Sequence, residues 1–285
     1  MVDNPQAVEK MVTIVTKTFQ RNDCITRLIS SIRKYYPSIR VIIADDNPKD
    51  NISDLQAPNT DHFVMPYNSG WNAGRNLAIS QVSTEYLVWV DDDFIFNEGT
   101  KLLYWLNFLE KNPLFDLVGG KVGTDDSLFS HASKLVYEDG SKGSCIARIP
   151  GTYGEVDNPE YSKECSVTDV VQNFYMARTL SIRKIGFDNF FKRFAHKEFF
   201  IDGKGKLMVA SCPGQVVIDH MPVQCNPNNG EYSKFRKPNT REWTNVMKKW
   251  YFRNNLMCMR EKSLMPIPEK VSEMIANSSA RQKRG

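Results

Sequence analysis

Short apolar runs and longer amphipathic stretches alternate through the first half of the chain. The apolar runs have the length of strands, and the amphipathic stretches repeat their apolar residues with helical spacing. Strands are expected at residues 12–15, 41–44, 62–65 and 86–90, and helices at residues 24–35, 71–82 and 100–109. Strands that alternate with helices in this way predict a parallel sheet covered by helices on both faces.

The second half of the chain has a less regular pattern. Residues 125–164 are rich in Gly, Ser and Tyr, which predicts hairpins or long loops. Further strands are expected at residues 117–120, 167–176, 207–210 and 216–218, and helices at residues 179–185 and 241–259. The sequence shows neither an internal repeat nor a flexible linker, so we predict one domain with a nucleotide-binding half and an acceptor-binding half.

The strand predicted over residues 86–90 ends in three consecutive carboxylates, Asp91, Asp92 and Asp93. Like charges this close raise one another's pKa unless a cation lies among them. Hard oxygen ligands suit Mn²⁺ or Mg²⁺, with a substrate phosphate completing the shell. A solvated turn is the alternative. These acids stand between two apolar runs, however, whereas the residues around a surface turn would be more mixed in polarity. The stretch therefore predicts a site for a metal and a phosphate.

Asp45 and Asp46 close the strand predicted over residues 41–44. Ligands of open α/β sheets bind beyond the carboxyl ends of the strands, so both acidic clusters are expected to line one crevice. In that crevice the two carboxylates could accept hydrogen bonds from a uracil N–H or a ribose hydroxyl. A helix N-cap, or a turn leading into Asn47, explains them equally well.

Residues 70–76 contain two glycines and introduce a predicted helix. Glycines let the backbone approach a ligand closely, and a helix N-terminus favours anions. Arg75 could pair with a phosphate or with the acids at 45 and 46. Helix capping is the simpler interpretation of the glycines.

Three residues of the second half are candidates for acid–base or metal chemistry. Glu198 stands beside Phe199, and neighbours of low polarity raise the pKa of a carboxylate and make it a better proton acceptor near neutral pH. Asp202 lies four residues later on the same helical face, so either acid could be the base; an exposed acid on an amphipathic helix is the alternative. His220 ends a predicted strand, where it could ligate Mn²⁺ or be structural.

The composition is that of an ordinary globular protein, and the net charge of +4 is too small to indicate a nucleic-acid partner. No apolar run approaches the roughly 20 residues of a membrane helix, and no secretory signal is present, so the chain as written is expected to be soluble. The six cysteines show no Cys-x-x-Cys spacing, which argues against a zinc site. If the domain works in the secretory lumen, Cys165 and Cys212 are the first expected pair, because each stands at the edge of a predicted strand. Two independent buried thiols are the alternative.

Several stretches resemble inverting GT-A glycosyltransferases in their order and rough spacing, over most of residues 11–220. These stretches are Thr16–Arg21, Ile43–Asp46, Gly74–Asn76, Asp91–Asp93, Ala177–Thr179, Ile185–Asp188 and Glu198. More narrowly, three near-continuous runs resemble the β-1,4-N-acetylgalactosaminyltransferases that make ganglioside-type and related glycans. These runs are Val12–Phe19, Gly74–Val82 and Val90–Phe94.

The resemblance implies an α/β fold of the GT-A (Rossmann-like) kind, with a mostly parallel sheet flanked by helices and an acceptor-binding half of hairpins and loops. It divides the chain into an N-terminal extension over residues 1–10, a catalytic domain over 11–262 and a tail over 263–285. Within the catalytic domain, residues 11–123 form the nucleotide-binding half and residues 124–262 the acceptor half. The implied cofactor is Mn²⁺ or Mg²⁺, and the implied donor is a UDP-sugar, with UDP-GalNAc the first expectation.

Site residues follow from the resemblance residue by residue. Glu198 would be the catalytic base, with Asp202 as its alternative. The metal would be held by Asp91, Asp93 and His220, with Asp93 the strongest ligand. Contacts to the UDP-sugar are assigned to Thr16, Arg21, Asp45, Asp46, Arg75, Asp91 and Asp92.

The expected reaction is transfer of GalNAc, with inversion, to a hydroxyl of a galactose-terminated glycan or glycolipid. Transfer from UDP-GlcNAc or UDP-glucose is the alternative among enzymes, and a silent relative that binds glycans or nucleotides is the alternative outside them. A nucleotidyltransferase fits the nucleotide half but not the region around Glu198. Members of the family are usually anchored in the Golgi, so the Golgi lumen is the expected location if this chain is anchored likewise; the chain itself shows no anchor. A homodimer is compatible with the resemblance.

Overall fold

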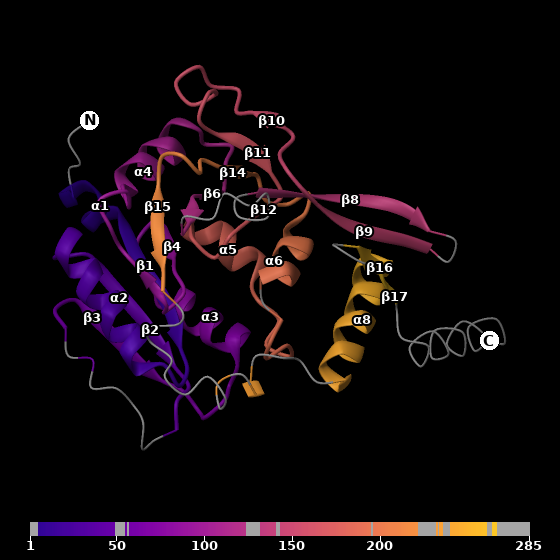
Figure 1. The fold of residues 1–285 in the computed structure, drawn as a ribbon, viewed down its shortest axis with the longest axis horizontal. Helices are drawn as coiled ribbons and strands as arrows, with labels where there is room; N and C mark the ends of the chain where they lie inside the picture. The colour runs from indigo at the N-terminus through magenta and orange to yellow at the C-terminus, as the bar shows by residue number, and fades with distance from the viewer. Residues whose placement is uncertain are drawn as a thin grey trace.

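The computed structural model describes residues 5–48, 55, 57–123, 132–140, 143–194, 196–221, 232, 234–235, 240–260 and 264–266. Its elements surround one large sheet (Figure 1). The strands of this sheet, in spatial order, are β10 (Gly154–Glu155), β11 (Ser166–Thr168), β14 (Val209–Ser211), β6 (Leu117–Gly119), β13 (Tyr175–Arg178), β4 (Tyr86–Trp89), β1 (Val12–Thr18), β2 (Arg40–Asp45) and β3 (Thr60–Val64). The helices are α1 (Pro5–Met11), α2 (Asn22–Tyr35), α3 (Trp71–Ser80), α4 (Leu102–Lys111), α5 (Thr179–Ile185), α6 (His196–Gly203) and α8 (Thr240–Asn254).

Strands β4, β1, β2 and β3 are neighbours and run parallel, and β14 runs parallel to β6. Between these two groups, β13 is antiparallel to both β4 and β6. The predicted Rossmann-like fold is therefore confirmed, and its sheet is mixed rather than mostly parallel, because β10, β11 and β13 add antiparallel pairings. Because β1, β2 and β4 are parallel, their carboxyl ends lie at the same edge of the sheet.

Helices cover both faces of the sheet, as the strand–helix alternation predicts. Successive side chains of a strand point to opposite faces. Ile14 of β1 accordingly packs in a core with residues of α1, α2 and α4, whereas Val15 packs in a second core with residues of α3, α5, α6 and α8. All seven residues of β1 are buried, as expected for a strand covered on both sides.

Two smaller sheets complete the fold. One has the order β12 (Val170–Val171), β8 (Ala132–Gly140), β9 (Gly143–Pro150), β16 (Leu256–Arg260) and β17 (Leu264–Pro266), and the other has the order β5 (Phe94–Ile95), β15 (Val217–His220) and β7 (Lys121–Val122). Strands β8 and β9 form an antiparallel hairpin that extends away from the main sheet (Figure 1). This hairpin confirms the expectation of hairpins within 125–164, although residues 124–131 lie outside the described residues.

The helix predicted over residues 241–259 is wrong in its last part. Helix α8 ends at Asn254, and Asn255 has a φ of 52°, the left-handed conformation that commonly terminates helices. The chain then forms β16, which pairs in parallel with β9. The backbone of this segment is hydrogen-bonded to a neighbouring strand, so its apolar residues do not continue the apolar face of the helix.

The single strand predicted over residues 167–176 is also wrong, because the chain forms three short strands there. Strands β11 and β13 belong to the main sheet, and β12 between them pairs with β8 of the second sheet. The chain changes sheets at Asp169, whose carboxylate accepts hydrogen bonds from the backbone N–H of Leu135 (2.7 Å) and from the Lys204 ammonium (2.9 Å).

Both ends of the described chain pack on other elements. Val8 of α1 is fully buried in the first core, and β17 pairs with β16. Of the tail predicted over residues 263–285, only residues 264–266 are among the described residues. Among the helices that the structure describes, none has the length and apolarity needed to cross a membrane.

Cys165 and Cys212 form a disulfide with their Cα atoms 4.3 Å apart, which confirms the first pairing expected from the sequence. The bridge joins the start of β11 to the end of β14 at one side of the main sheet. A second disulfide joins Cys145 of β9 to Cys258 of β16.

Replacing both Cys165 and Cys212 by alanine is expected to lower the free energy of unfolding by about 4 kcal/mol in the chain-entropy model, because the bridge closes a loop of 47 residues. Urea denaturation of the purified variant and the oxidised wild type measures the difference. The control is the same comparison under reducing conditions, where the wild type and the variant should unfold at nearly the same midpoint because reductant opens every bridge. An unchanged unfolding midpoint would contradict a stabilising role for this bridge.

Candidate active site

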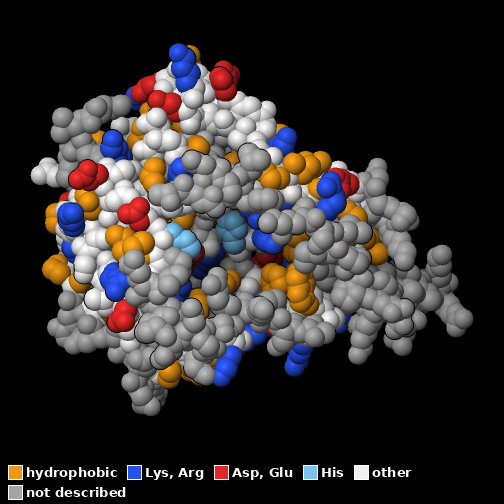
Figure 2. All heavy atoms as spheres, viewed as in Figure 1, with side chains coloured by type: hydrophobic (Ala, Val, Ile, Leu, Met, Phe, Trp, Pro, Cys, Tyr) orange, Lys and Arg blue, Asp and Glu red, His pale blue; other side chains and the backbone are white. Residues whose placement is uncertain are grey.

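A cavity of about 520 Å³ lies beyond the carboxyl ends of β1 and β4. Figure 2 shows this face of the molecule hollowed near its middle, with basic and histidine side chains around the hollow. The described residues that line the cavity are Lys17, Arg21, Trp71, Arg75, Trp89, Asp91, Asp92, Asp93, Phe94, Val122, Arg148, Gln172, Asn173, His196, His220 and Tyr232. A volume of this size is in the usual range of small-molecule sites.

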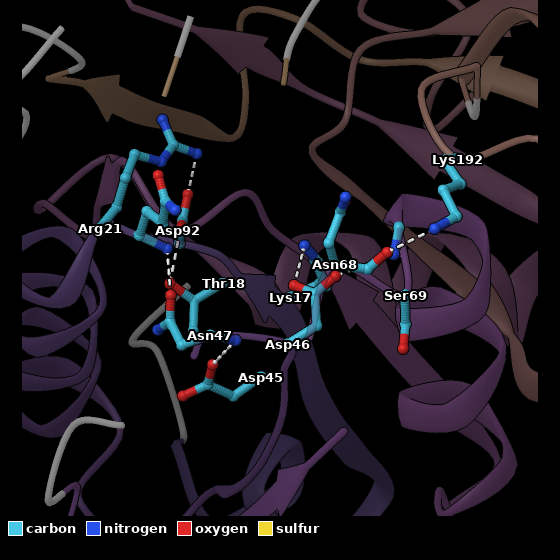
Figure 3. Close-up of polar contacts among 12 residues, drawn as sticks. Lys17, Thr18, Arg21, Asp45, Asp46, Asn47, Asn68, Ser69, Asp92 and Lys192 are labelled. Atoms are coloured by element: carbon cyan, nitrogen blue, oxygen red, sulfur yellow. Dashed lines mark hydrogen bonds and ion pairs between the residues drawn. The ribbon is translucent and has the colours of Figure 1, made fainter. Parts of the chain in front are cut away.

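Asp92 lies at the base of the cavity and is 1% exposed. Its carboxylate accepts a hydrogen bond of 2.8 Å from the Thr18 hydroxyl and pairs with the Arg21 guanidinium (Figure 3). Burial raises the pKa of Asp92, and the charge of Arg21 opposes this effect. The last residue of β1 therefore donates a hydrogen bond to the acid that follows β4, and Arg21 at the start of α2 supplies the charge that neutralises it.

Asp93 pairs with the same arginine, at 2.7 Å from Nη1, and its Oδ2 lies 3.5 Å from Nε2 of His220. Burial acts to raise the pKa of Asp93, but hydrogen bonding to His220 and the charge of Arg21 outweigh it and lower the pKa. The antiparallel pairing of β15 with β5 places His220 opposite Phe94, next to this carboxylate. Asp93 is thus held as a carboxylate at the wall of the cavity.

Asp91 faces a different set of partners. Asn173 donates a hydrogen bond of 2.9 Å to Oδ2, the Trp89 indole donates one of 3.2 Å to Oδ1, and the Arg75 guanidinium lies 3.7 Å away. Burial raises the pKa of Asp91, and Arg75 opposes this. The Arg75 guanidinium also stacks 4.4 Å from the Trp89 ring and is itself 4% exposed. A buried cation therefore faces the cavity from α3.

The acids at the end of β2 are held by protein groups. Asp45 accepts hydrogen bonds from the backbone N–H of Asn47 (2.8 Å) and lies 2.9 Å from Nε2 of His62. Asp46 pairs with Lys17 at 2.5 Å (Figure 3). It also accepts a hydrogen bond of 2.8 Å from the backbone N–H of Gly70. Neither acid is among the described residues that line the cavity.

Gly70 allows this connection between β2 and α3, and its replacement by alanine is expected to lower stability. Its φ is +97°, and an added Cβ would lie 2.7 Å from the backbone Cα of Lys192. A side chain in this conformation costs roughly 1–3 kcal/mol. Urea denaturation should show this loss for Gly70→Ala and little change for Gly214→Ala, where an added Cβ meets no atom within 4 Å. Equal stability of the two variants would contradict this prediction.

The two predicted catalytic acids lie behind the cavity wall. Glu198 is 1% exposed; one oxygen pairs with the Lys249 ammonium of α8, and the other lies 3.4 Å from the Asn72 amide. Asp202 pairs with the same ammonium at 2.7 Å. Neither acid is among the described lining residues. Thr16, the remaining predicted donor contact, is fully buried within β1 and does not line the cavity either.

Several lining residues were not identified from the sequence, namely Lys17, Trp71, Arg148, Gln172, Asn173 and His196. Lys17 stood within a stretch already marked by the resemblance, and its position at a strand end was the available signal. His196 has no such signal. Burial, with the nearby Arg148 and Arg75, lowers its pKa to about 3, so the neutral imidazole donates from Nε2 to the Val171 carbonyl at 2.5 Å.

The predicted metal ligands fit a divalent cation only in part. Asp93 and His220 lie together at the cavity wall and offer a carboxylate oxygen and an imidazole nitrogen, both suited to Mn²⁺. Asp91 is engaged by Asn173 and Trp89 instead. Within the described ranges, no group of three His, Cys, Asp or Glu side chains is arranged to hold a metal.

Comparison with known proteins identifies relatives by sequence. The chain is 41% identical over 264 residues to the rat protein named beta-1,4 N-acetylgalactosaminyltransferase 1, covering 88% of this chain and 48% of that protein. It is also 41% identical over 258 residues to mouse beta-1,4 N-acetylgalactosaminyltransferase 2, with the same coverage. The chain thus spans about half the length of these curated relatives. The sequence identities confirm the resemblance that its motifs indicate.

Solved structures support the fold. The crystal structure of S. aureus TarS 1-349 in complex with UDP-GlcNAc matches with a TM-score of 0.57 and 16% identity, covering 84% of this chain and 64% of that one. The crystal structure of S. aureus TarS 1-349 also matches, with a TM-score of 0.52 over 86% of this chain and 73% of that one. At such identity the likeness concerns the fold alone. Residues 13–157 match the model of the family described as glycosyl transferase family 2, and the chain belongs to this family.

Proposed function

We propose that this chain transfers N-acetylgalactosamine from UDP-GalNAc to a hydroxyl of a galactose-terminated glycan or glycolipid, with inversion at the anomeric carbon. One observation carries the proposal: the carboxylates at the end of β4 meet Arg21, Arg75 and His220 around a cavity at the ligand-binding edge of the sheet. The names of the relatives at 41% identity support the donor and the reaction. The crystal structure of TarS with UDP-GlcNAc supports a UDP-sugar as the class of donor.

The donor diphosphate is proposed to bind between Arg75 and Asp93. Arg75 supplies a buried positive charge. Its attraction for the leaving diphosphate grows as negative charge develops there. Asp92 and Asp93 hold Arg21 at the other side of the cavity, so that this guanidinium is fixed before the donor arrives. Oriented charges of this kind stabilise a transition state without reorganising during the reaction.

Mn²⁺ or Mg²⁺ dependence belongs to the same proposal. Asp93 and His220 would hold the ion, and diphosphate oxygens and water would complete its shell. When bound, the ion would neutralise negative charge on the departing diphosphate. Asp91 is proposed to bind the ribose or to join the metal shell, a role that requires it to exchange its contact with Asn173.

Glu198 is proposed to take the proton from the acceptor hydroxyl, with Asp202 as the alternative base. In this structure its carboxylate lies against Lys249 behind the wall formed by Trp71 and His196. The proposal therefore requires the carboxylate to turn toward the cavity when the acceptor binds. Catalytic hydrogen bonds often form only in the substrate complex, so geometry without substrate does not exclude a base.

A Golgi-luminal location is part of the proposal. The disulfides Cys145–Cys258 and Cys165–Cys212 support an oxidising compartment. Analysis of protein recovered from its native cells tests this, since free thiols at these four positions would contradict it.

Product analysis tests the proposed reaction. The purified chain is incubated with Mn²⁺ and a panel of galactose-terminated acceptors, and UDP-GalNAc, UDP-GlcNAc and UDP-glucose are supplied in parallel. Mass spectrometry should show addition of one N-acetylhexosamine from UDP-GalNAc, and proton NMR should show a β-linked anomeric proton. An α-linked product, or a product only with another donor, would overturn the proposal in that respect. No product with any donor would favour a silent, ligand-binding relative.

A further inference from the structure

A single lysine from the C-terminal helix is buried among three carboxylates behind the cavity. The ammonium of Lys249 pairs with Glu198, lies 2.7 Å from Oδ2 of Asp202 and lies 3.4 Å from Oδ2 of Asp188. We call these four residues the Lys249 cluster. It joins α8, α6 and the segment after α5, which are distant in sequence.

Lys249 and Glu198 are held away from water, whereas the side chains of Asp202 and Asp188 are 21% and 22% exposed. The side chain of Lys249 is 6% exposed and that of Glu198 is 1% exposed. Charges that are buried this deeply must be paired, and removal of one partner leaves the others uncompensated. The ammonium also lies 5.3 Å from the ring centroid of Phe191, which adds a favourable cation–π contact. The positions of these side chains are therefore strongly coupled.

The C-terminal segment brings Lys249 to this place and fixes it there. Val246 and Trp250 of α8 are buried in the second core. The chain then continues into β16, which pairs with β9 and is bridged to it by Cys145 and Cys258, with Cα atoms 4.7 Å apart. Helix α8 is thus anchored by packing on one side and by a covalent bridge just beyond its end.

One carboxylate of the cluster, that of Glu198, is linked to two residues of the cavity wall. Helix α6 carries Glu198 two residues after His196, which lines the cavity. Asn72, whose amide approaches Glu198, directly follows the lining residue Trp71 and also donates hydrogen bonds to the carbonyls of Asp188 (2.8 Å) and Phe194 (2.9 Å). A shift of Glu198 is therefore transmitted to two wall residues, His196 on its own helix α6 and Trp71 on α3.

We infer that Lys249 is a positioning residue for the acceptor side of the active site. Its ammonium fixes Glu198 and the first turn of α6, and thereby the wall formed by His196 and Trp71. The inference rests on the proposed function, because it assigns Lys249 a part in sugar transfer. Donor binding depends on other residues, mainly at the ends of β1 and β4, so Lys249 acts on turnover and not on donor affinity.

Three variants test this inference. Lys249→Met removes the charge, Lys249→Arg keeps it, and Lys248→Met is the matched control on the same helix, since Lys248 forms no ion pair within the described part of the chain. Displacing catalytic groups by about 1 Å can cost about 10²-fold in rate. We therefore expect a fall of about 10²-fold in kcat for Lys249→Met, substantial recovery in Lys249→Arg and no change in Lys248→Met, with equal affinity for UDP by calorimetry in all three.

Hydrogen–deuterium exchange supplies a readout that needs no substrate. Lys249→Met should accelerate exchange of the α6 amides and leave β1 and β4 unchanged, while Lys248→Met should match the wild type. Unchanged α6 exchange, or unchanged kcat in Lys249→Met, would overturn the inference. Loss of UDP affinity together with kcat would also overturn it, because the role would then be support of the whole fold. A wild type that transfers no sugar would refute the proposed function, and the exchange of α6 would still decide whether Lys249 holds the wall.

Discussion

Replacing Asp93 by alanine is expected to remove nearly all sugar transfer while leaving the fold intact. Asp93 faces the cavity with His220 on one side and Arg21 on the other. The variant removes the carboxylate proposed to hold the metal and also releases one arm of Arg21. Loss of a single group that stabilises developing charge typically costs about 10²–10³-fold in kcat, and we expect at least this loss here.

The measurement is initial-rate transfer from UDP-GalNAc with Mn²⁺, with thermal unfolding to confirm that the variant folds. Electron paramagnetic resonance of Mn²⁺ in the presence of UDP should show weakened metal binding, a readout independent of turnover. Asp61→Ala is the matched control, because Asp61 pairs with Arg40 at the surface and both side chains are about one-third or more exposed. Full activity of Asp93→Ala, or of the wild type in a chelator, would disprove the metal assignment.

The first half of the fold, from β1 to α4, could be predicted from sequence because its burial is local and repetitive. Strands β1, β2 and β4 are almost fully buried on both faces, and each is a largely apolar run in the sequence. The edge strand β3 is the exception. Helix α2 buries Ile25, Leu28 and Ile32 on one face, which gives the helical spacing. The C-terminal part could not be predicted in the same way. Strand β16 owes its conformation to β9, and the two bridged cysteines are 113 residues apart.

Those residues of the candidate site that directly follow a predicted strand could be predicted from the sequence. The rule that ligands bind beyond the carboxyl ends of parallel strands placed Asp91, Asp92 and Asp93 at the cavity. The same rule applied to Asp45 and Asp46 could not show that Asn47, His62, Lys17 and Gly70 would bind their carboxylates. A pattern along the chain shows where a charge stands, but the group that neutralises it comes from tertiary contacts.

Glu198 illustrates the same limit. Its aromatic neighbours predicted a low-polarity setting, and the side chain is indeed buried in the core with Phe199 and Phe200. Its neighbours in sequence did not indicate which cation pairs with it in the fold. Lys249 lies fifty-one residues later and is brought to Glu198 by the packing of α8. Whether this acid acts in catalysis therefore has to be decided by a variant that changes its proton affinity and little else.

Replacing Glu198 by glutamine is expected to lower kcat by about 10²–10⁴-fold, the usual cost of losing a positioned general base. Glutamine keeps the shape of the side chain and its approach to Asn72, but it cannot take up the acceptor proton. Lys249 retains Asp202 and Asp188 as partners, so the variant should fold, and thermal unfolding checks this. The affinity for UDP should stay at the wild-type value, because Arg21, Arg75 and Asp93 are unchanged.

Asp202→Asn is the matched comparison, because it removes the other α6 carboxylate bound to Lys249 and leaves the proposed base in place. We expect this variant to keep most of its turnover. An inactive Asp202→Asn beside an active Glu198→Gln would show that Asp202 is the base. If Glu198→Gln instead lost thermal stability and UDP affinity together, the ion pair with Lys249 would be architectural, and the proton would have to leave through a residue that already lines the cavity. Asp91 would then be the first to test, since its carboxylate lines the cavity and is 32% exposed.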